Sequence, residues 1–318
     1  MKISLVTPAG RQSRAGNRTT AVRWARIFRQ LGHRVVITEQ DDATNADMMV
    51  AVHAWRSHHT IRKFSDKFPN RPLVVLLAGT DIYSFQHSHP EETLDSMDRA
   101  SALVCLHDRV DRAIPKRFGK KLYVIYQSAP PLTSQRGPNK TTFDICVVGH
   151  LRDEKDSLRA AYAAKLASPA SKLRVIHLGK AHNKKWEDAA QKEAKSNPRF
   201  ISLGEVPGWR VRRQFASSHA MVISSVMEGG ANVVSEAVSA GLPIIASDID
   251  GNIGLLGEDY EGYYAVQNTE ALATALQRAE TDPNFLPRLA AQCRKKQSLF
   301  KPKGEIEAWK RLLRDLCE

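Results

Sequence analysis

Short apolar runs alternate with helix-like segments along the whole chain, and this alternation constrains the fold more than any other feature. Such a pattern is typical of α/β proteins, in which helices connect the strands of parallel sheets. The runs expected to form strands are Ile3–Thr7, Val35–Thr38, Met48–His53, Leu73–Ala78, Ala102–Leu106, Leu122–Tyr126, Phe143–Val148, Leu173–Leu178, Phe200–Leu203, Ala220–Ser224, Pro243–Ser247 and Tyr263–Val266. The main segments expected to form helices are residues 19–31, 155–166, 184–195, 208–217, 232–240, 269–280, 284–298 and 305–316. The sequence therefore predicts an α/β fold with doubly wound, Rossmann-like sheets.

A polar segment rich in proline and glycine, residues 130–140, separates two halves of similar architecture. Segments of this composition are typical of linkers. We predict one Rossmann-like domain over residues 1–135 and another over residues 141–300. Residues 301–318 form a last amphipathic segment with an apolar stripe that includes Trp309. Two such halves bind a ligand in the cleft between them, near the C-terminal ends of the strands.

The composition indicates a globular chain that does not insert into a membrane. With 318 residues, 42% apolar and 25% charged, it is long enough for two buried cores. No apolar stretch reaches the roughly 18 residues that a membrane span needs. The four cysteines are scattered and form no Cys-x-x-Cys pair, which favours a reducing compartment over a cysteine metal site. We therefore expect a cytoplasmic protein.

Positive charge is unevenly distributed along the chain. The net charge is +13, and seven arginines precede the first acid, Glu39. Such charge suits nucleic acid, an acidic membrane surface or a highly charged small substrate. No helix-turn-helix, zinc-finger or RNA-recognition signature accompanies it, so we expect no nucleic-acid partner. Arginine matches phosphate-like anions, and we expect Arg11, Arg14 and Arg18, which flank a loop, to bind an anionic ligand.

Residues 224–241 combine two acids, two glycines and a helix start in a pattern that suits a phosphate ligand. An apolar run ends at Glu228, two glycines follow, and a helix-like segment opens at Asn232. Glycines let backbone N–H groups approach a ligand closely, and a helix start offers unpaired N–H donors. Glu236, just beyond the first turn, is placed to accept both hydroxyls of a ribose. The same residues also fit an ordinary strand–turn–helix with two surface acids.

This Glu-x7-Glu arrangement resembles the donor site of GT-B glycosyltransferases of the family 4 type. The resemblance implies two Rossmann-like domains and a C-terminal helix that crosses back to the first, acceptor-side domain. It implies that the second domain binds the nucleotide sugar, that Glu236 holds the ribose and that Glu228 assists donor activation. The donor-binding residues that it implies in this segment are Gly229, Gly230, Ala231, Asn232 and Glu236.

The segment Val148–Asp156 resembles the family motif Gly-Arg-Leu-x-x-x-Lys-Gly, whose arginine and lysine clamp the donor diphosphate. Lys155 matches the lysine. His150 stands where the family has arginine, and Asp156 stands where it has glycine, so the clamp departs from the family pattern. Histidine still donates to a phosphate oxygen, with a charge that depends on pH. The resemblance therefore makes Lys155, His150 and Glu228 the candidate catalytic residues.

Two more loops complete the predicted donor site. In the family, backbone groups of the loop that corresponds to Gly204–Pro207 hold the nucleobase, which implies a contact at Val206. The loop at residues 10–17 has glycines at both ends and a helix start behind it, and this favours an anion nest. The resemblance places the donor diphosphate beside Gly16 and Asn17.

Polar residues also end two strands of the first half. His53 ends one strand, and Thr80 and Asp81 follow another. We expect all three on the acceptor side, although His53 also fits a structural role and Asp81 also fits a helix cap. Asp248–Asp250 has the Asp-x-Asp spacing of metal-dependent glycosyltransferases, but paired loop acids are usually solvated. Because a positive clamp already faces the diphosphate, we expect no metal and no cofactor, the UDP-sugar being a co-substrate.

Several segments spread over nearly the whole chain resemble the selenosugar synthase family of selenoneine biosynthesis. They are Thr7–Gly10, Gly16–Ala21, Trp24–Arg26, Ala54–Ser57, Ala78–Tyr83 and Gly254–Tyr260. The resemblance implies transfer of a sugar from a UDP-sugar, UDP-GlcNAc or UDP-glucose, to selenophosphate, with release of UDP. Selenophosphate is small and multiply anionic, so clustered arginines would offset its repulsion from the donor diphosphate. A selenium nucleophile needs no strong base, so the main demand is stabilisation of the departing UDP.

Two other functions stay open on the sequence. A conventional family 4 glycosyltransferase with a hydroxyl acceptor has the same donor site. Trp24, Ile27 and Phe28 lie beside arginines, so the first helix also suits docking on an anionic membrane surface. A non-catalytic nucleic-acid binder is suggested by charge alone. The donor sugar, the retaining or inverting outcome, the general base and the oligomeric state are not determined by the sequence.

Overall fold

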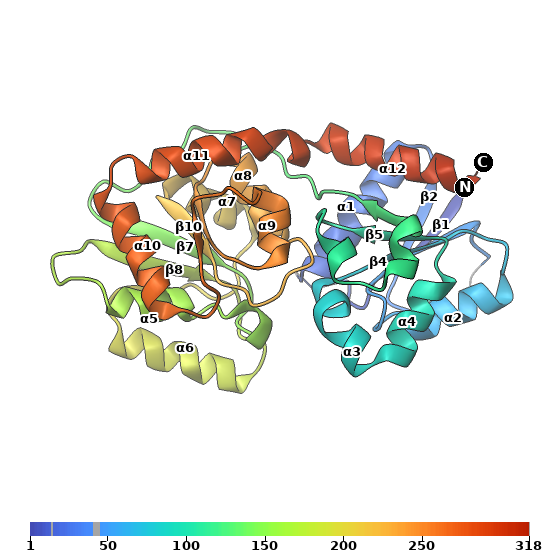
Figure 1. Ribbon diagram of the computed structural model, residues 1–318, viewed down its shortest axis with the longest axis horizontal. Coiled ribbons are helices and arrows are strands. Elements are labelled where there is room, and N and C mark those ends of the chain that lie inside the picture. Colours follow the sequence, from blue (N-terminus) through green and yellow to red (C-terminus); the bar gives the residue numbers. More distant parts are fainter. Residues whose placement is uncertain (14, 41–44, 318) are drawn as a thin grey trace. The chain divides into compact units, whose positions relative to one another are not determined.

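A computed structural model of the chain describes residues 1–13, 15–40 and 45–317, and it divides into two compact units (Figure 1). The first unit comprises Met1–Gln127 and Pro302–Glu318, and the second comprises Ser128–Lys301. Each unit is an α/β structure with a parallel six-stranded sheet in the described part of the chain. The chain therefore has the predicted fold class.

The sheet of the first unit has the strand order β2-β1-β3-β4-β5-β6. Its strands are β1 (Lys2–Val6), β2 (Arg34–Thr38), β3 (Met48–Val52), β4 (Leu73–Leu76), β5 (Ala102–Cys105) and β6 (Leu122–Val124). Neighbouring residues of one strand belong to different apolar clusters: Val50 lies in one and Ala51 in the other. Because side chains alternate along a strand, the two clusters cover opposite faces of the sheet. Burial on both faces explains why the central strands β3, β4 and β5 read as continuous apolar runs.

Helices cover this sheet. They are α1 (Gly16–Gln30), α2 (His58–Lys67), α3 (Gln86–Ser88), α4 (Pro90–Arg99) and α12 (Pro302–Cys317), with a π-helical turn η1 (Asp81–Phe85) and the 3₁₀ turns η2 (Val110–Arg112) and η3 (Lys116–Lys121). The C-terminal helix α12 returns to the first unit, as predicted, and packs on α1 (Figure 1). The Trp309 ring lies 4.6 Å from that of Trp24 and 4.7 Å from that of Phe28, centroid to centroid. The carboxylate of Glu305 accepts a hydrogen bond from Trp24 Nε1 at 2.9 Å.

The apolar face of α1 is therefore an internal surface. Trp24, Ile27 and Phe28 are all buried, and the apolar cluster that holds them includes residues of α12. Their burial contradicts the alternative, left open by the sequence, in which these three side chains dock on an anionic membrane. An amphipathic helix shows only that one face is covered, and here the chain's own last helix supplies part of the cover.

The sheet of the second unit has the order β12-β11-β10-β7-β8-β9. Its strands are β7 (Phe143–Val148), β8 (Leu173–Leu178), β9 (Phe200–Ser202), β10 (Ala220–Ile223), β11 (Ile244–Ser247) and β12 (Tyr263–Tyr264). The helices are α5 (Arg159–Lys165), α6 (Lys184–Ser196), α7 (Gly208–Ser217), α8 (Asn232–Ser239), α9 (Asp250–Leu256), α10 (Thr269–Thr281) and α11 (Phe285–Lys296), with the 3₁₀ turns η4 (Asp153–Lys155) and η5 (Gln297–Phe300). The chain runs from β7 outward to β8 and β9, and then returns to β10 on the other side. Ligands of doubly wound sheets bind at such a reversal.

The strands predicted from apolar runs all occur, and the differences lie at helix ends. The first helix, predicted over residues 19–31, begins earlier, at Gly16, after Ala15 and without a side-chain cap. The segment predicted as one helix over 155–166 is divided, because Asp156 has a left-handed backbone (φ 44°) between η4 and α5. The helix α9, which starts within the Asp-x-Asp segment, was not predicted.

Replacing Trp309 with alanine is expected to lower the free energy of unfolding by about 3–5 kcal/mol, because the substitution leaves a cavity between α12 and α1. Urea denaturation followed by circular dichroism measures this change. Lys310→Ala, at an exposed position of the same helix, is the control and is expected to change stability by less than about 0.5 kcal/mol. Equal stability of the two variants would contradict the packing of α12 on the first unit.

Candidate functional site

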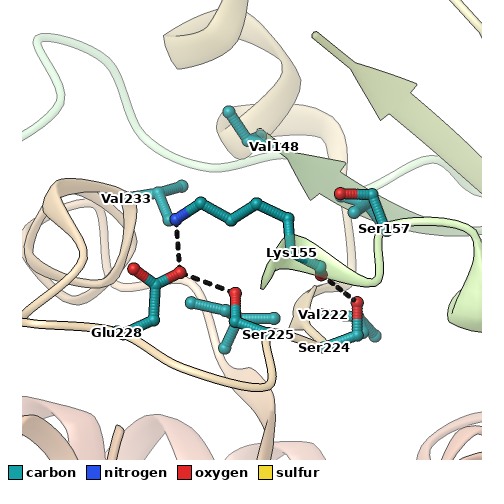
Figure 2. A pocket seen from close by; sticks show the side chains of 10 residues that line it. Val148, Lys155, Ser157, Val222, Ser224, Ser225, Glu228 and Val233 are labelled. Atoms are coloured by element: carbon teal, nitrogen blue, oxygen red, sulfur yellow. Dashed lines mark hydrogen bonds and ion pairs between the residues drawn. The ribbon is translucent and has the colours of Figure 1, made fainter. Parts of the chain in front are cut away.

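The candidate site of the second unit lies at the C-terminal ends of β7 and β10, where the strand order reverses. Figure 2 shows a small pocket there, formed by β7, β10, the segment before α5 and the start of α8. The residues that line it are Val147, Val148, Lys155, Ser157, Val222, Ile223, Ser224, Ser225, Glu228 and Val233. Two of the three predicted catalytic residues, Lys155 and Glu228, are thus brought together.

Lys155 and Glu228 form an ion pair across this pocket. The extended Lys155 side chain reaches Oε1 of Glu228, and the same oxygen accepts a hydrogen bond from Ser225 Oγ at 2.6 Å (Figure 2). No side chain or backbone group among the described residues bonds to Oε2 of Glu228. The carboxylate is therefore held through one oxygen, and its second oxygen is available to a hydroxyl group of a ligand.

A chain of buried polar groups holds the backbone of the segment that carries Glu228. Ser247 Oγ donates to the carbonyl of Ser225 at 2.6 Å, and Asn252 Nδ2 donates to Ser247 Oγ at 3.0 Å. A Cβ atom at Gly251 would lie 2.2 Å from the carbonyl oxygen of Glu228, so only glycine lets α9 approach this closely. Sequence reasoning missed this support. The only sign of this support in the sequence is the Ser224-Ser225 pair directly after a buried strand.

The loop that carries Lys155 is bonded to the end of β10. Ser224 Oγ donates to the carbonyl of Asp156 at 2.8 Å, and the N–H of Val226 donates to the carbonyl of Glu154 at 3.0 Å. The left-handed backbone at Asp156 explains why the family motif has glycine at this position. Aspartate tolerates this conformation better than most residues. Its carboxylate accepts a hydrogen bond from Arg159 Nε at 2.8 Å.

His150 lies half-buried beyond the end of β7. Its Nδ1 accepts a hydrogen bond from the N–H of Lys180 at 3.3 Å, so in the neutral ring Nε2 carries the proton. Burial lowers the pKa of His150; the charges of Arg152, Lys180 and Lys155 lower it further, and Glu205 opposes them. His150 therefore offers a neutral N–H donor within a cluster of cations. Lys180 is a member of this cluster that sequence reasoning missed, although it lies two residues after the buried strand β8.

The glycine segment leads into α8 as predicted. Gly230 has a positive φ of 107°, α8 begins at Asn232, and its N-cap, Ala231, has no side-chain cap. In this first turn the N–H of Val234 donates to the carbonyl of Ala231 at 3.0 Å. Glu236 lies half-buried one turn further along this helix. Contacts of Gly229, Gly230, Ala231, Asn232 and Glu236 with a donor stay predictions.

The predicted nucleobase loop follows β9. Val206 is buried, and Gly204 has a positive φ of 65°. The carbonyl of Gly204 accepts a hydrogen bond from the N–H of Gly179 at 2.8 Å, so this loop is bonded to the end of β8. Its contact with a nucleobase stays a prediction.

In the first unit, the carboxylate of Asp81 organises the ends of β3 and β4. It is almost fully buried and accepts three backbone hydrogen bonds at 2.8–3.0 Å. The donors are the N–H groups of Ala54, Trp55 and Ala78. Such a carboxylate is satisfied without a ligand. The structure gives Asp81 an internal role, and its contact with an acceptor stays a prediction.

His53 connects Asp81 to Thr80. Nδ1 of His53 lies 2.7 Å from Oδ1 of Asp81, and Nε2 lies 3.1 Å from Oγ1 of Thr80. The short contact with a carboxylate requires a proton on Nδ1, so the 3.3 Å approach of the Arg56 N–H to the same atom is not a hydrogen bond. His53 also has a positive φ of 81°, a strained value for a residue other than glycine. Thr80 is half-buried, and its contact with an acceptor stays a prediction.

The arginine loop is only partly described. Arg11 is exposed, and its N–H donates to Oε1 of Glu39 at 3.1 Å, so an acid lies beside this loop. Arg18 is half-buried in the first turn of α1, which begins at Gly16 and Asn17 and has no acid in that turn. Arg14 lies outside the described residues. Anion binding by this loop therefore stays a prediction, as do the contacts of Gly16 and Asn17.

Three rings stack beside His53 and were not predicted as site residues. The Trp55 ring lies 4.2 Å from that of Phe85 and 4.5 Å from that of His89. Phe85 ends the π-helical turn η1, and such turns occur frequently at functional sites. All three side chains are half-buried. A tryptophan two residues after a strand-end histidine is the signal that the sequence offered.

The Asp-x-Asp segment has a structural use. Oδ1 of Asp248 accepts a hydrogen bond from the N–H of Val266 at 2.8 Å, and Asp250 is the first residue of α9. Across residues 1–13, 15–40 and 45–317, no three histidine, cysteine, aspartate or glutamate side chains gather as metal ligands would. No helix in the same ranges is long and apolar enough to cross a membrane.

A family model and solved structures resemble the chain. The model for glycosyl transferases group 1 matches residues 131–298. The structure of HepE from Anabaena with UDP and glucose is 15% identical, with a TM-score of 0.80 over 99% of this chain and 100% of that chain. Sucrose-phosphate synthase from Thermosynechococcus elongatus is 16% identical, with a TM-score of 0.79 over 99% and 98%.

The lipopolysaccharide outer core galactosyltransferase WaaB, solved without ligand, is 14% identical, with a TM-score of 0.70 over 99% of both chains. At such identities these structures establish a shared GT-B fold. No curated protein sequence matches the chain.

Lowering the pH from 7 to 4.5 is expected to destabilise the second unit through His177 on β8. Burial lowers the pKa of His177 to about 4 from its ordinary 6.5. Between these values the unfolded chain binds a proton that the folded chain does not, so the stabilisation is complete above pH 6.5 and is lost as the pH falls toward 4. This linkage removes about 2–3 kcal/mol by pH 4.5.

Urea denaturation at pH 7 and pH 4.5 tests this expectation. In His177→Gln, whose side chain does not titrate, the loss between the two pH values is expected to be smaller by that amount. An equal loss in both proteins would show that His177 is not held neutral in the folded chain.

Proposed function

Because the chain belongs to the glycosyl transferases group 1 family, we propose that it transfers a sugar from a UDP-sugar to a small anionic acceptor. The observation that carries this proposal is the Lys155–Glu228 pair, with one carboxylate oxygen unused, next to the uncapped start of α8. Related folds support a uridine nucleotide: HepE structures contain UDP, UDP with glucose, and UDP-glucose. The donor in this proposal is UDP-glucose or UDP-GlcNAc.

The proposed donor site assigns each residue a separate part of the donor. Lys155, Nε2 of His150 and the amides of Gly229 and Gly230 face the diphosphate, where negative charge develops as the sugar departs. Glu236 accepts the ribose hydroxyls. The other groups proposed to contact the donor are Val206, Ala231 and Asn232 in the second unit and Gly16 and Asn17 in the first.

The ion pair explains how an acid and a diphosphate occupy one site. Two anions at close range repel each other, and Lys155 lies where its charge offsets both. In the proposal Lys155 moves toward the phosphates when the donor binds, and Ser225 continues to hold Oε1 of Glu228. Oε2 then accepts a hydrogen bond from a hydroxyl of the donor sugar and orients the anomeric carbon.

The proposed acceptor is selenophosphate. Its selenium attacks the anomeric carbon, a C–Se bond forms, the bond from that carbon to the UDP oxygen breaks, and UDP leaves with the electron pair. Arg11, Arg14, Arg18 and Thr80 are the groups proposed to hold the acceptor, with His53 and Asp81 positioning Thr80. The absence of acids from the first turn of α1 supports an anion there. In the proposal, protein groups offset the negative charge of the departing UDP and of the acceptor, so it includes neither a metal nor a cofactor.

A conventional hydroxyl acceptor is the second candidate, and one observation favours it. The stacked rings of Trp55, Phe85 and His89 offer an apolar surface of the kind that packs against a flat ring. A sugar or another cyclic acceptor would use this surface, whereas selenophosphate would not.

Mass spectrometry of reaction mixtures separates the two acceptors. The protein, UDP-glucose or UDP-GlcNAc and selenophosphate are expected to yield UDP and a product with selenium on the sugar, also after dialysis against EDTA. Simple sugars in place of selenophosphate are expected to yield neither. UDP release with sugars alone would support the hydroxyl acceptor, and no UDP release with any acceptor would contradict both.

A further inference from the structure

The backbone ladder continues past the ends of β7 and β8 but lacks one hydrogen bond. The N–H of Gly149 donates to Leu178 at 3.0 Å, and the N–H of Leu151 donates to Lys180 at 2.9 Å. In a regular parallel ladder the bond between these two runs from the N–H of Lys180 to the carbonyl of Gly149. No such bond is present in this described part of the chain. The Gly149–His150 peptide is therefore rotated out of the ladder.

Two histidines bond the groups that this rotation leaves unpaired. Nε2 of His177 lies 2.9 Å from the carbonyl oxygen of Gly149, and Nδ1 of His150 accepts the N–H of Lys180 at 3.3 Å. His177 is completely buried on β8. Its Nε2 must carry the proton, since a carbonyl only accepts hydrogen bonds. The rotated peptide thus has two dedicated side-chain partners.

Gly179 makes the rotation possible. A Cβ atom at this position would lie 1.9 Å from the carbonyl oxygen of Gly149 and 3.0 Å from the nitrogen of His150. Any other residue would push this peptide back toward the ladder. Gly179 directly follows β8, and both it and Nε2 of His177 approach the same carbonyl oxygen of Gly149.

After this rotation His150 has two hydrogen-bond donors, its backbone N–H and its ring Nε2–H, on one residue. In a trans peptide the N–H points opposite to the carbonyl, so the N–H of His150 points away from His177. No described residue accepts a hydrogen bond from this N–H or from Nε2 of His150. A backbone donor and a ring donor therefore lie on one residue, within the cation cluster of Lys155, Lys180 and Arg152.

We infer that the rotated Gly149–His150 peptide is a binding element for the diphosphate of the donor and that His177 is its positioning residue. This inference rests on the proposed function. The N–H of His150 donates to a phosphate oxygen, and this bond replaces part of what the family's arginine supplies at the same position. His177 acts only through the peptide and touches no ligand. Without it, the peptide returns to the ladder and the donor diphosphate is bound more weakly.

Calorimetric titration with UDP and with uridine tests this inference. In His177→Leu the dissociation constant of UDP is expected to rise about tenfold, as for the loss of one hydrogen bond to a charged group. That of uridine, which has no phosphate, is expected to stay unchanged. His177→Gln, whose side-chain N–H reaches as far as Nε2, is expected to keep most of the UDP affinity. Tyr260→Phe is the matched control, because Tyr260 is also buried and bonds Ile244 at the opposite end of the sheet.

The outcomes separate this inference from the proposed function. If the wild-type protein does not bind UDP, the proposed function fails. If the wild type binds UDP more tightly than uridine and His177→Leu does so equally, the inference fails and the proposed function stands. An equal loss of UDP affinity and uridine affinity in His177→Leu would also overturn the inference, because that result indicates general damage to the site.

A measurement on the unchanged protein covers the case in which His177→Leu does not fold. The amide proton signal of His150, followed by NMR, is expected to shift downfield when UDP is added and to stay in place with uridine. The same response to both ligands, or to neither, would overturn the inference.

Discussion

The proposed donor site of the second unit depends on the buried carboxylate of Glu228. A buried carboxylate without partners would cost several kcal/mol. Lys155 and Ser225 both bond its Oε1, and each belongs to a segment that further bonds hold in place. Ser224 bonds the loop of Lys155, Ser247 bonds the backbone of Ser225, and Gly251 lets α9 approach Glu228. Three segments distant in sequence thus meet at one carboxylate, and the geometry of the proposed donor site follows from its need for partners.

The strand ends of both units use buried side chains in the same way. Asp81 accepts three backbone N–H groups at the ends of β3 and β4, and His177 and His150 bond groups that leave the ladder between β7 and β8. Because these side chains satisfy the backbone internally, other groups nearby are left for a ligand. The two donors of His150 in the second unit are such groups. Strained or rotated backbone is tolerated at such places where the surrounding structure supports it.

The sequence predicted the strands well, because the central ones are apolar runs buried on both faces. The resemblance to the family motifs also placed Lys155 and Glu228 in one site, and the structure brings both to the ends of strands at the same edge of one sheet. The support beneath them was not predictable, because hydrogen bonds such as that between Ser247 and Ser225 join residues far apart in the chain. The same reason explains the error about Trp24 and Phe28, which α12 covers from the far end of the sequence. The rotated peptide left no trace in the sequence except Gly179 and an unusual histidine in an apolar strand.

The central claim is that the second unit holds the uridine diphosphate part of the donor. Calorimetric titration of UDP into the folded protein tests it most directly, with the variants Glu236→Ala and Lys155→Met and, as control, Lys184→Met at an exposed position of α6. Micromolar binding to the wild type and to the control is predicted, with loss of at least tenfold in the other two variants. No heat from UDP with the wild type, or equal affinity in all four proteins, would contradict the account.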